Sequence, residues 1–194
     1  MPERRQARFR TLEEASLEEW RLIDEAEREH RRAGRGGGLM RLLATIDRDD
    51  PLGAPLNVFA HSLQTATRVL RDGGDDELVV VALFHDLPEA FSDNRHGLLA
   101  AELLAPWLSE RRRWILIHHE DFQAYHYRNH PTCDRFARDR YRGHPYFEDT
   151  VAFCARYDQL AFDINYPTLP LDEFAPIVTR FFARERPPLP PLPD

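Results

Sequence analysis

The stretch DDELVVVALFHD, residues 75–86, decides the fold class. Its two aspartates can cap the start of a helix, and seven apolar residues follow from Leu78 to Phe84. An apolar run of this length is typical of either a buried strand or a buried helix. A helix is favoured because no second strand candidate exists, and a lone strand would leave its backbone groups unpaired. The stretch therefore predicts an all-α protein.

Helical patterns fill most of the remaining chain. An amphipathic helix is expected from Leu12 to Arg32, with Ser16 and Glu19 as a capping box, and Arg35 to Gly38 is expected to be a glycine-rich break. Further helices are expected at residues 39–47, 56–71, 97–108, 110–127, 147–162 and 171–183. This pattern predicts a helical extension packed on the core at 1–55, a helical bundle at 56–185 and a proline-rich tail at 186–194.

Length and composition restrict the classes of function. A chain of 194 residues fits one domain. The net charge of −7 argues against a nucleic-acid partner, which requires a basic surface. No window approaches the roughly 18 consecutive apolar residues of a membrane helix, and the charged N-terminus lacks the apolar region of a signal peptide. With only two cysteines, these features predict a cytoplasmic location without membrane contact.

The pair His85-Asp86 ends the buried run and is the first candidate for chemistry. A His-Asp dipeptide is expected about once by chance in a chain of this composition, so the pair alone means little. Its position means more, because a buried carboxylate without a partner costs several kcal/mol. An arginine or a metal ion must therefore compensate Asp86.

Further histidines and aspartates lie on other predicted helices, each beside apolar residues. A single histidine on an apolar face is most often a core residue with a satisfied partner. Several such coincidences favour a shared metal site, because each buried group would otherwise need a partner of its own. The residues are His61, His96, His118, His119 and Asp158.

The order His61, His85-Asp86, Asp158 resembles the signature of the HD-domain superfamily of metalloenzymes. The first motif, HSLQTA at residues 61–66, is similar to the opening motif of the mixed-valent di-iron oxygenases in this superfamily, which include phosphonate-cleaving oxygenases and myo-inositol oxygenase. The resemblance covers about half the chain. It implies a single HD-domain helical bundle with the metal site in its core, two iron ions or manganese, molecular oxygen and a small hydroxylated substrate.

The resemblance also implies individual roles. Asp86 would bridge the two metals and take part in catalysis. The two sets of remaining ligands would be His61, His85 and Asp158 on one metal, and His96 and His118 on the other. His118 is favoured over its neighbour because Ile115 fits an Ile-x-x-His phrase of the family, which leaves His119 as a catalytic or substrate contact. Gln64, one turn after His61, would contact a ligand or the substrate.

Departures from the family pattern concern the substrate pocket. The phosphonate-cleaving enzymes carry a lysine or similar group one turn after the fourth histidine, where this chain has Phe122, or Gln123 if His119 is the ligand. They carry an arginine one turn before the last aspartate, where this chain has Ala155, with Arg156 one position away. We assign substrate contacts to Gln123, Tyr125, Arg156 and Glu89, although ordinary surface or packing roles are alternatives for these residues.

Three functions follow as hypotheses. The first is a di-iron oxygenase that cleaves a small phosphonate-like or polyol-like substrate. The second is a metal-dependent phosphohydrolase acting on a nucleotide or a small phosphate ester, in which the same ligands would activate water. The third is a helical binding module without catalysis, which would be expected if ligand positions had been lost.

Overall fold

The computed structural model describes residues 6–47, 50–92 and 94–184, and every regular element in these ranges is helical. The prediction of an all-α fold is thus confirmed for this part of the chain, whereas the proline-rich tail predicted at 186–194 lies outside it. The seven α-helices are α1 (Leu17–Thr45), α2 (Val58–Arg71), α3 (Asp76–Phe84), α4 (His96–Leu104), α5 (Glu110–Gln123), α6 (Phe147–Arg156) and α7 (Ala175–Phe182).

Short 3-10 helices extend or link these elements. They are η1 (Leu12–Glu14), η2 (Leu87–Ala90), η3 (Ala105–Trp107), η4 (Ala124–His126), η5 (Ala137–Tyr141), η6 (Asp158–Leu160) and η7 (Leu171–Phe174). None of the helices in the described ranges is long and apolar enough to cross a membrane.

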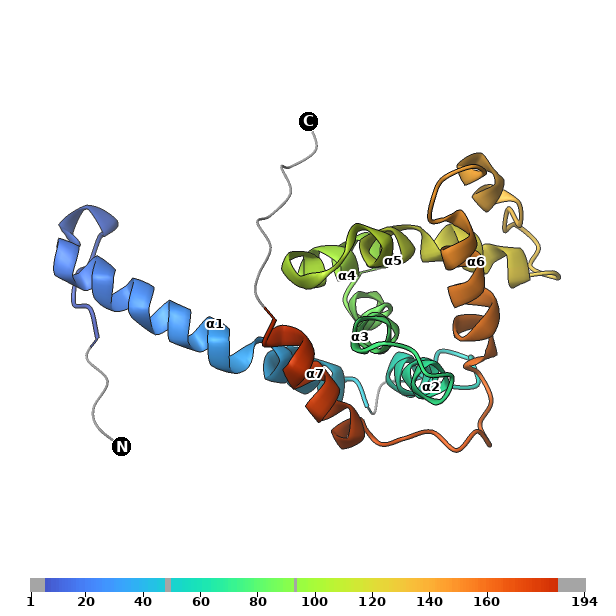
Figure 1. Ribbon diagram of the computed structural model, residues 1–194, viewed down its shortest axis with the longest axis horizontal. Helices are drawn as coiled ribbons and strands as arrows, with labels where there is room; N and C mark the ends of the chain where they lie inside the picture. The colour runs from blue at the N-terminus through green and yellow to red at the C-terminus, as the bar shows by residue number, and fades with distance from the viewer. Residues whose placement is uncertain (1–5, 48–49, 93, 185–194) are drawn as a thin grey trace.

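Helix α3, formed by the stretch that decided the fold class, lies at the centre of the bundle (Figure 1). The side chain of Asp75 accepts a hydrogen bond from the backbone N–H of Leu78 at 2.7 Å and so caps the helix. Residues 79–84 are all buried. Helices α2, α5 and α7 pack around α3, which explains why its sequence is apolar on every side.

Helix α1 corrects the prediction of a glycine-rich break, because it runs without interruption through Gly36, Gly37 and Gly38. A Cβ atom on Gly36 would lie 2.8 Å from side-chain atoms of Val178 and Phe182. The glycine therefore lets α7 approach the α1 backbone closely. Each glycine costs a helix roughly 1 kcal/mol, and burial of the residues that follow offsets this cost.

The two halves of α1 differ in their surroundings. Its N-terminal half projects from the bundle (Figure 1) and exposes Leu17 and Trp20. The capping box of Ser16 and Glu19 is present at its start. Its C-terminal half packs against α7, and Leu39 and Leu43 are buried there. The second part of the predicted extension thus belongs to the core.

Three of the predicted helices end earlier than their sequence patterns indicate. Helix α4 ends at Leu104, α5 at Gln123 and α6 at Arg156, and each is followed by a 3-10 turn. After α6 the backbone of Tyr157 leaves the helical region, with φ −123° and ψ −64°. Asp158 therefore starts the separate turn η6, and its side chain is fully buried against α2 and the end of α3.

Candidate metal centre

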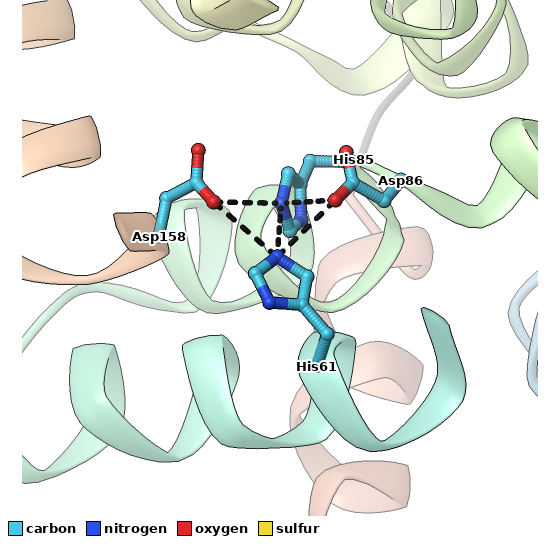
Figure 2. A group of neighbouring side chains, drawn as sticks. All are labelled: His61, His85, Asp86 and Asp158. Atoms are coloured by element: carbon cyan, nitrogen blue, oxygen red, sulfur yellow. Dashed lines mark hydrogen bonds and ion pairs between the residues drawn. The ribbon is translucent and has the colours of Figure 1, made fainter. Parts of the chain in front are cut away.

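Four side chains from three segments converge at the core of the bundle (Figure 2). His61 comes from α2, His85 and Asp86 follow the last turn of α3, and Asp158 begins η6. Nε2 of His61 lies 3.2 Å from Nε2 of His85 and 3.3 Å from Oδ1 of Asp158. Asp86 Oδ2 lies 3.2 Å from Nε2 of His61 and 3.1 Å from Nε2 of His85. We call these four residues the first donor group.

A second group of donors meets the other oxygen of Asp86. Its Oδ1 atom lies 3.2 Å from Nε2 of His96 and 3.1 Å from Nε2 of His119. The two imidazole nitrogens are 3.1 Å apart. We call Asp86, His96 and His119 the second donor group. The two carboxylate oxygens of Asp86 thus face different groups, as in a carboxylate that bridges two ions.

The spacing of the donor atoms fits metal coordination. Nitrogen and oxygen ligands lie about 2.0–2.2 Å from a zinc-like ion, so neighbouring ligand atoms are roughly 3.0–3.5 Å apart. The separations that involve a histidine nitrogen of the first group run from 3.1 to 3.7 Å, the longest of these joining His85 and Asp158. Those in the second group are 3.1–3.2 Å. Both groups of buried histidines and aspartates could therefore hold a metal ion.

The backbone orients three of the histidines toward this role. The Nδ1 atoms of His61, His85 and His119 lie 3.0, 2.9 and 2.7 Å from the backbone carbonyls of Ala161, Ala82 and Leu116, respectively. Carbonyl oxygens only accept hydrogen bonds, so each Nδ1 must carry the proton. The Nε2 atom of the neutral ring is then a bare lone pair directed into the cluster, which is the arrangement of metal-ligating histidines.

The electrostatics of the first donor group require a cation. Burial alone would lower the pKa of His61, but its hydrogen bonds to Asp158 and Asp86 outweigh burial and raise the pKa to about 9. Burial alone would raise the pKa of Asp158, but its hydrogen bonds with His61 and His85 hold that pKa below its usual value. Oδ2 of Asp158 is buried and has no hydrogen-bond partner among the described residues. Protons or metal ions must balance the carboxylates.

The structure reverses the predicted roles of two adjacent histidines. His118, predicted to be a ligand, lies among aromatic rings, with centroids 3.8 Å from Trp114 and 4.5 Å from Tyr141. His119 enters the second donor group instead. Its position continues the buried stripe of Ile115 and Leu116 on α5. The Ile-x-x-His phrase led to its neighbour, and the unbroken apolar run from Trp114 to Ile117 leaves the buried face of this helix undefined in the sequence.

The two adjacent rings also differ in their surroundings. Burial lowers the pKa of His118 to about 4, so this ring is neutral at physiological pH and packs as an aromatic residue. His119 is fully buried beside Asp86. Consecutive residues on a helix point about 100° apart, so both side chains cannot face the same site.

Gln64 is also corrected, because its side chain does not reach the donor groups. Its Nε2 atom donates to the carbonyl of Asp163 at 2.9 Å, and its Oε1 atom accepts from the Asp163 N–H at 3.1 Å. The two ends of the amide thus hold the N–H and the C=O of a single residue in the segment that follows η6. The Gln64 amide therefore holds this segment, and these hydrogen bonds do not involve the donor groups.

A cavity of about 370 Å³ opens beside the donor groups. His61, Asp86 and His96 form part of its wall, and Glu89 and Gln123 line it as predicted for substrate contacts. Sequence reasoning missed several other lining residues, although Phe162 follows Asp158 by four positions and Tyr127 follows Gln123 by four. The lining residues that were not predicted are Tyr127, Phe162, Asp50, Pro51, Leu52, Ala54, Leu56, Asn57 and Val58.

Gln123 and Glu89 differ in the hydrogen bonds that their side chains form. Gln123 Nε2 donates to Oδ1 of Asp158 at 2.7 Å, and its Oε1 atom accepts from the hydroxyl of Tyr127 at 2.9 Å. Gln123 therefore orients a member of the first donor group. The side chain of Glu89 forms no hydrogen bond or ion pair with any described residue. Burial and the nearby charge of Asp86 raise its pKa.

Two predicted substrate contacts lie outside the cavity. The ring of Tyr125 is covered by the guanidinium of Arg138, which lies 3.5 Å from its centroid. Arg156 is exposed and forms an ion pair with Asp72. Neither residue lines the cavity. Both side chains are engaged by surface partners, so their assignment to the substrate is corrected.

No family model and no curated protein matches this chain.

Proposed function

We propose that this protein is a metal-dependent enzyme of the HD-domain type that uses a pair of metal ions to oxidise a small hydroxylated substrate with molecular oxygen. The observation that carries this proposal is the position of Asp86. Its two oxygens each lie within 3.2 Å of the histidine nitrogens of a different donor group. A carboxylate between two sets of bare imidazole nitrogens is suited to hold two ions side by side.

The chemistry of the donors supports iron, with manganese as the second candidate. The two groups together offer four imidazoles and two carboxylates and contain no thiolate. Imidazole suits iron and several other transition metals, whereas carboxylate oxygen suits the harder ions. A mixed set of this kind fits iron or manganese better than a structural zinc site, which is typically rich in cysteine.

The cavity favours oxygen chemistry over phosphate hydrolysis. Phosphate groups are usually held by arginine or lysine in bidentate or point-charge contacts. Among the described residues that line the cavity there is no arginine or lysine, and Asp50, Asp86 and Glu89 are acidic. Gln123, which occupies the position of the phosphonate enzymes' lysine once His119 is taken as the ligand, is committed to Asp158 and Tyr127. A polyol-like substrate therefore suits the site better than a phosphonate.

Side chains around the metal pair would position a ligand, cover the site and bind the substrate. A pair of iron ions would supply oxygen activation and one-electron oxidation. Gln123 holds the carboxylate of Asp158 in place. Phe162, whose ring centroid is 4.6 Å from that of His61, shields the first donor group from water. Glu89 offers a carboxylate to the bound substrate.

Metal content and spectroscopy test this proposal. We expect protein purified with ferrous iron under low oxygen to contain about two iron ions per chain, one for each donor group. Partial oxidation should then produce the electron paramagnetic resonance signal of a mixed-valent pair. A panel of polyols and amino alcohols should stimulate oxygen consumption. Absence of the mixed-valent signal in iron-loaded protein would remove the main support for an oxygenase.

A phosphohydrolase is the second candidate, and one observation favours it. The unpaired carboxylate of Glu89 beside the donor groups could accept a proton from a metal-activated water. We would then expect hydrolysis of nucleotides or phosphate esters with manganese and without oxygen. Turnover under strict anaerobic conditions would favour this function. Protein that holds no metal, with a His85→Ala variant of unchanged stability, would instead indicate a binding module without catalysis.

A further inference from the structure

Glu89 is a carboxylate in the wall of the cavity beside the candidate metal centre. It lies on η2, three residues after Asp86, and lines the cavity together with His61 and His96. Its side chain forms no hydrogen bond or ion pair with the described residues. By contrast, two acidic residues on α5 and α4 have arginine partners, Asp121 with Arg140 and Glu102 with Arg113. An unpaired carboxylate in a cavity wall can serve a ligand.

The charge of the cavity wall also disfavours an anionic ligand. The chain carries 26 arginines and no lysine, and no arginine is among the described residues that line this cavity, where the only basic side chains are those of the donor histidines His61 and His96. Asp50 adds a second carboxylate, whose Oδ1 atom accepts a hydrogen bond from the Leu52 N–H at 2.8 Å. An anionic group on a ligand would meet two carboxylates and no compensating arginine at this part of the wall.

Two aromatic rings complete the wall. Phe162 and Tyr127 both line the cavity, and the Tyr127 hydroxyl is held by Gln123. Aromatic faces attract cations through their quadrupole, and the attraction grows when water is excluded. A carboxylate beside aromatic rings is a common environment for an ammonium group. The volume of about 370 Å³ lies near the lower end of the range for ligand pockets, roughly 300–1,000 Å³, so the ligand is small.

We propose that the cavity selects a small amino alcohol, whose hydroxyl groups face the donor groups and whose ammonium group pairs with Glu89. This inference rests on the proposed metal pair, because the metal ions would bind the hydroxyl end. It adds to the proposed function the residue that selects the substrate and the charge of the group that it recognises. A substrate that carries phosphate or carboxylate at the same end is excluded by the same residues.

Three small molecules that share the same hydroxylated, metal-binding end test whether the cavity prefers a cationic group at the other end. They are 3-amino-1,2-propanediol, glycerol and glycerate, which share a hydroxylated end and carry an ammonium, a hydroxyl or a carboxylate at the other. Their dissociation constants are measured by calorimetry on the full chain loaded with manganese under nitrogen, so that no oxygen chemistry is needed. We expect the amino-diol to bind at least about tenfold tighter than glycerol, and glycerate to bind weakest.

A Glu89→Gln variant isolates the carboxylate. It should remove the preference for the amino-diol while leaving the affinity for glycerol and the manganese content unchanged. Glu173→Gln is the matched control, because Glu173 is an exposed carboxylate on η7 that does not line the cavity. This control should behave as the unmodified protein does. Rescue of the preference by Glu89→Asp, at reduced strength, would further support a charge contact.

The outcomes separate this inference from the proposed function. A preference for glycerate, or an amine preference that survives Glu89→Gln, would overturn the inference and leave the metal pair untouched. Loss of manganese in Glu89→Gln would also overturn it, because the carboxylate would then serve the metals. Failure of the unmodified protein to bind any metal would overturn the proposed function first. Amine selectivity without oxygen consumption would retain the inference and contradict only the oxygenase.

Discussion

The two donor groups share Asp86 but differ in how completely the protein encloses them. The first has four donors, all of them buried, from α2, the end of α3 and η6. The second has three, and the side chain of His96 is 16% exposed. An ion that prefers six ligands would therefore keep more open positions in the second group. The difference predicts that an ion in the first group would be held more firmly than an ion in the second.

Removing the shared carboxylate should have the largest effect. Asp86→Asn keeps the shape of the side chain but removes the charge that both groups use. We expect both ions to be lost, with affinity reduced by about a thousandfold or more, because the remaining imidazoles would face each other without a central anion. Metal content after gel filtration measures the effect, and circular dichroism checks that the bundle is folded. Retention of one ion would mean that Asp86 does not bridge.

Replacing each of the two adjacent histidines in turn tests the second donor group alone. His119→Gln should reduce metal content from about two ions per chain to about one, because only the second group loses a donor. His118→Gln is the matched control and should retain both ions, since His118 packs against Trp114 and Tyr141. Elemental analysis of both variants distinguishes them. The reverse result would restore His118 as the ligand.

The pH dependence of the metal-free protein reports on the first donor group. Because the pKa of His61 is raised to about 9 from its usual 6.5, the protonated ring stabilises the fold fully below about pH 6.5. This contribution is lost as the pH rises through about 9, and its size is on the order of 3 kcal/mol. Asp158 stays ionised throughout, because its pKa is lowered.

Urea unfolding of metal-free protein across this pH range measures the loss. Metal affinity should change in the opposite direction and rise with pH, because a bound ion must displace the His61 proton. The free energy of unfolding of a His61→Gln variant should depend less strongly on pH, with only the raised pKa values of His85 and His96 remaining. A constant free energy of unfolding between about pH 6.5 and 9.5 in the unmodified protein would contradict the interpretation.

The smallest effect is expected from the residue that orients Asp158. Gln123→Leu removes the 2.7 Å hydrogen bond to Asp158 Oδ1 but keeps the volume of the side chain. We expect metal affinity of the first group to fall by about 10- to 100-fold, the usual cost of losing a partner behind a ligand. Gln159→Leu is the control, because the Gln159 amide donates only to the Ala155 carbonyl. Equal affinities in the two variants would argue against a role for Gln123.

The parts of this site that the sequence predicted follow from contiguous patterns. The buried helix α3 and the pair His85-Asp86 were identified because seven apolar residues precede them without a break. The choice between His118 and His119 depended on the rotation of α5, which the packing of Ile115 and Leu116 against the core determines. Spacing from a family phrase carries no information about that rotation.

Other residues could not be assigned from local sequence because distant contacts determine their roles. Gln64 shares a helix with His61, yet the backbone of Asp163, 99 positions away, binds both ends of its amide. The glycines of α1 are typical of a loop, but the approach of Val178 and Phe182 gives Gly36 a role inside a helix. In each case a long-range contact overrides the local tendency.

The close approach at Gly36 has a consequence for where the folding unit begins. Because α7 rests on the α1 backbone there, and α7 packs in turn on α3, the boundary of the cooperative unit falls inside a helix and not at a linker. Deleting the exposed half of α1 would shorten a rod that touches little else. A truncation that extends beyond Gly36 would expose Val178 and Phe182 to solvent and remove the helix that packs on this side of the core. The minimal autonomous fragment therefore starts in mid-helix.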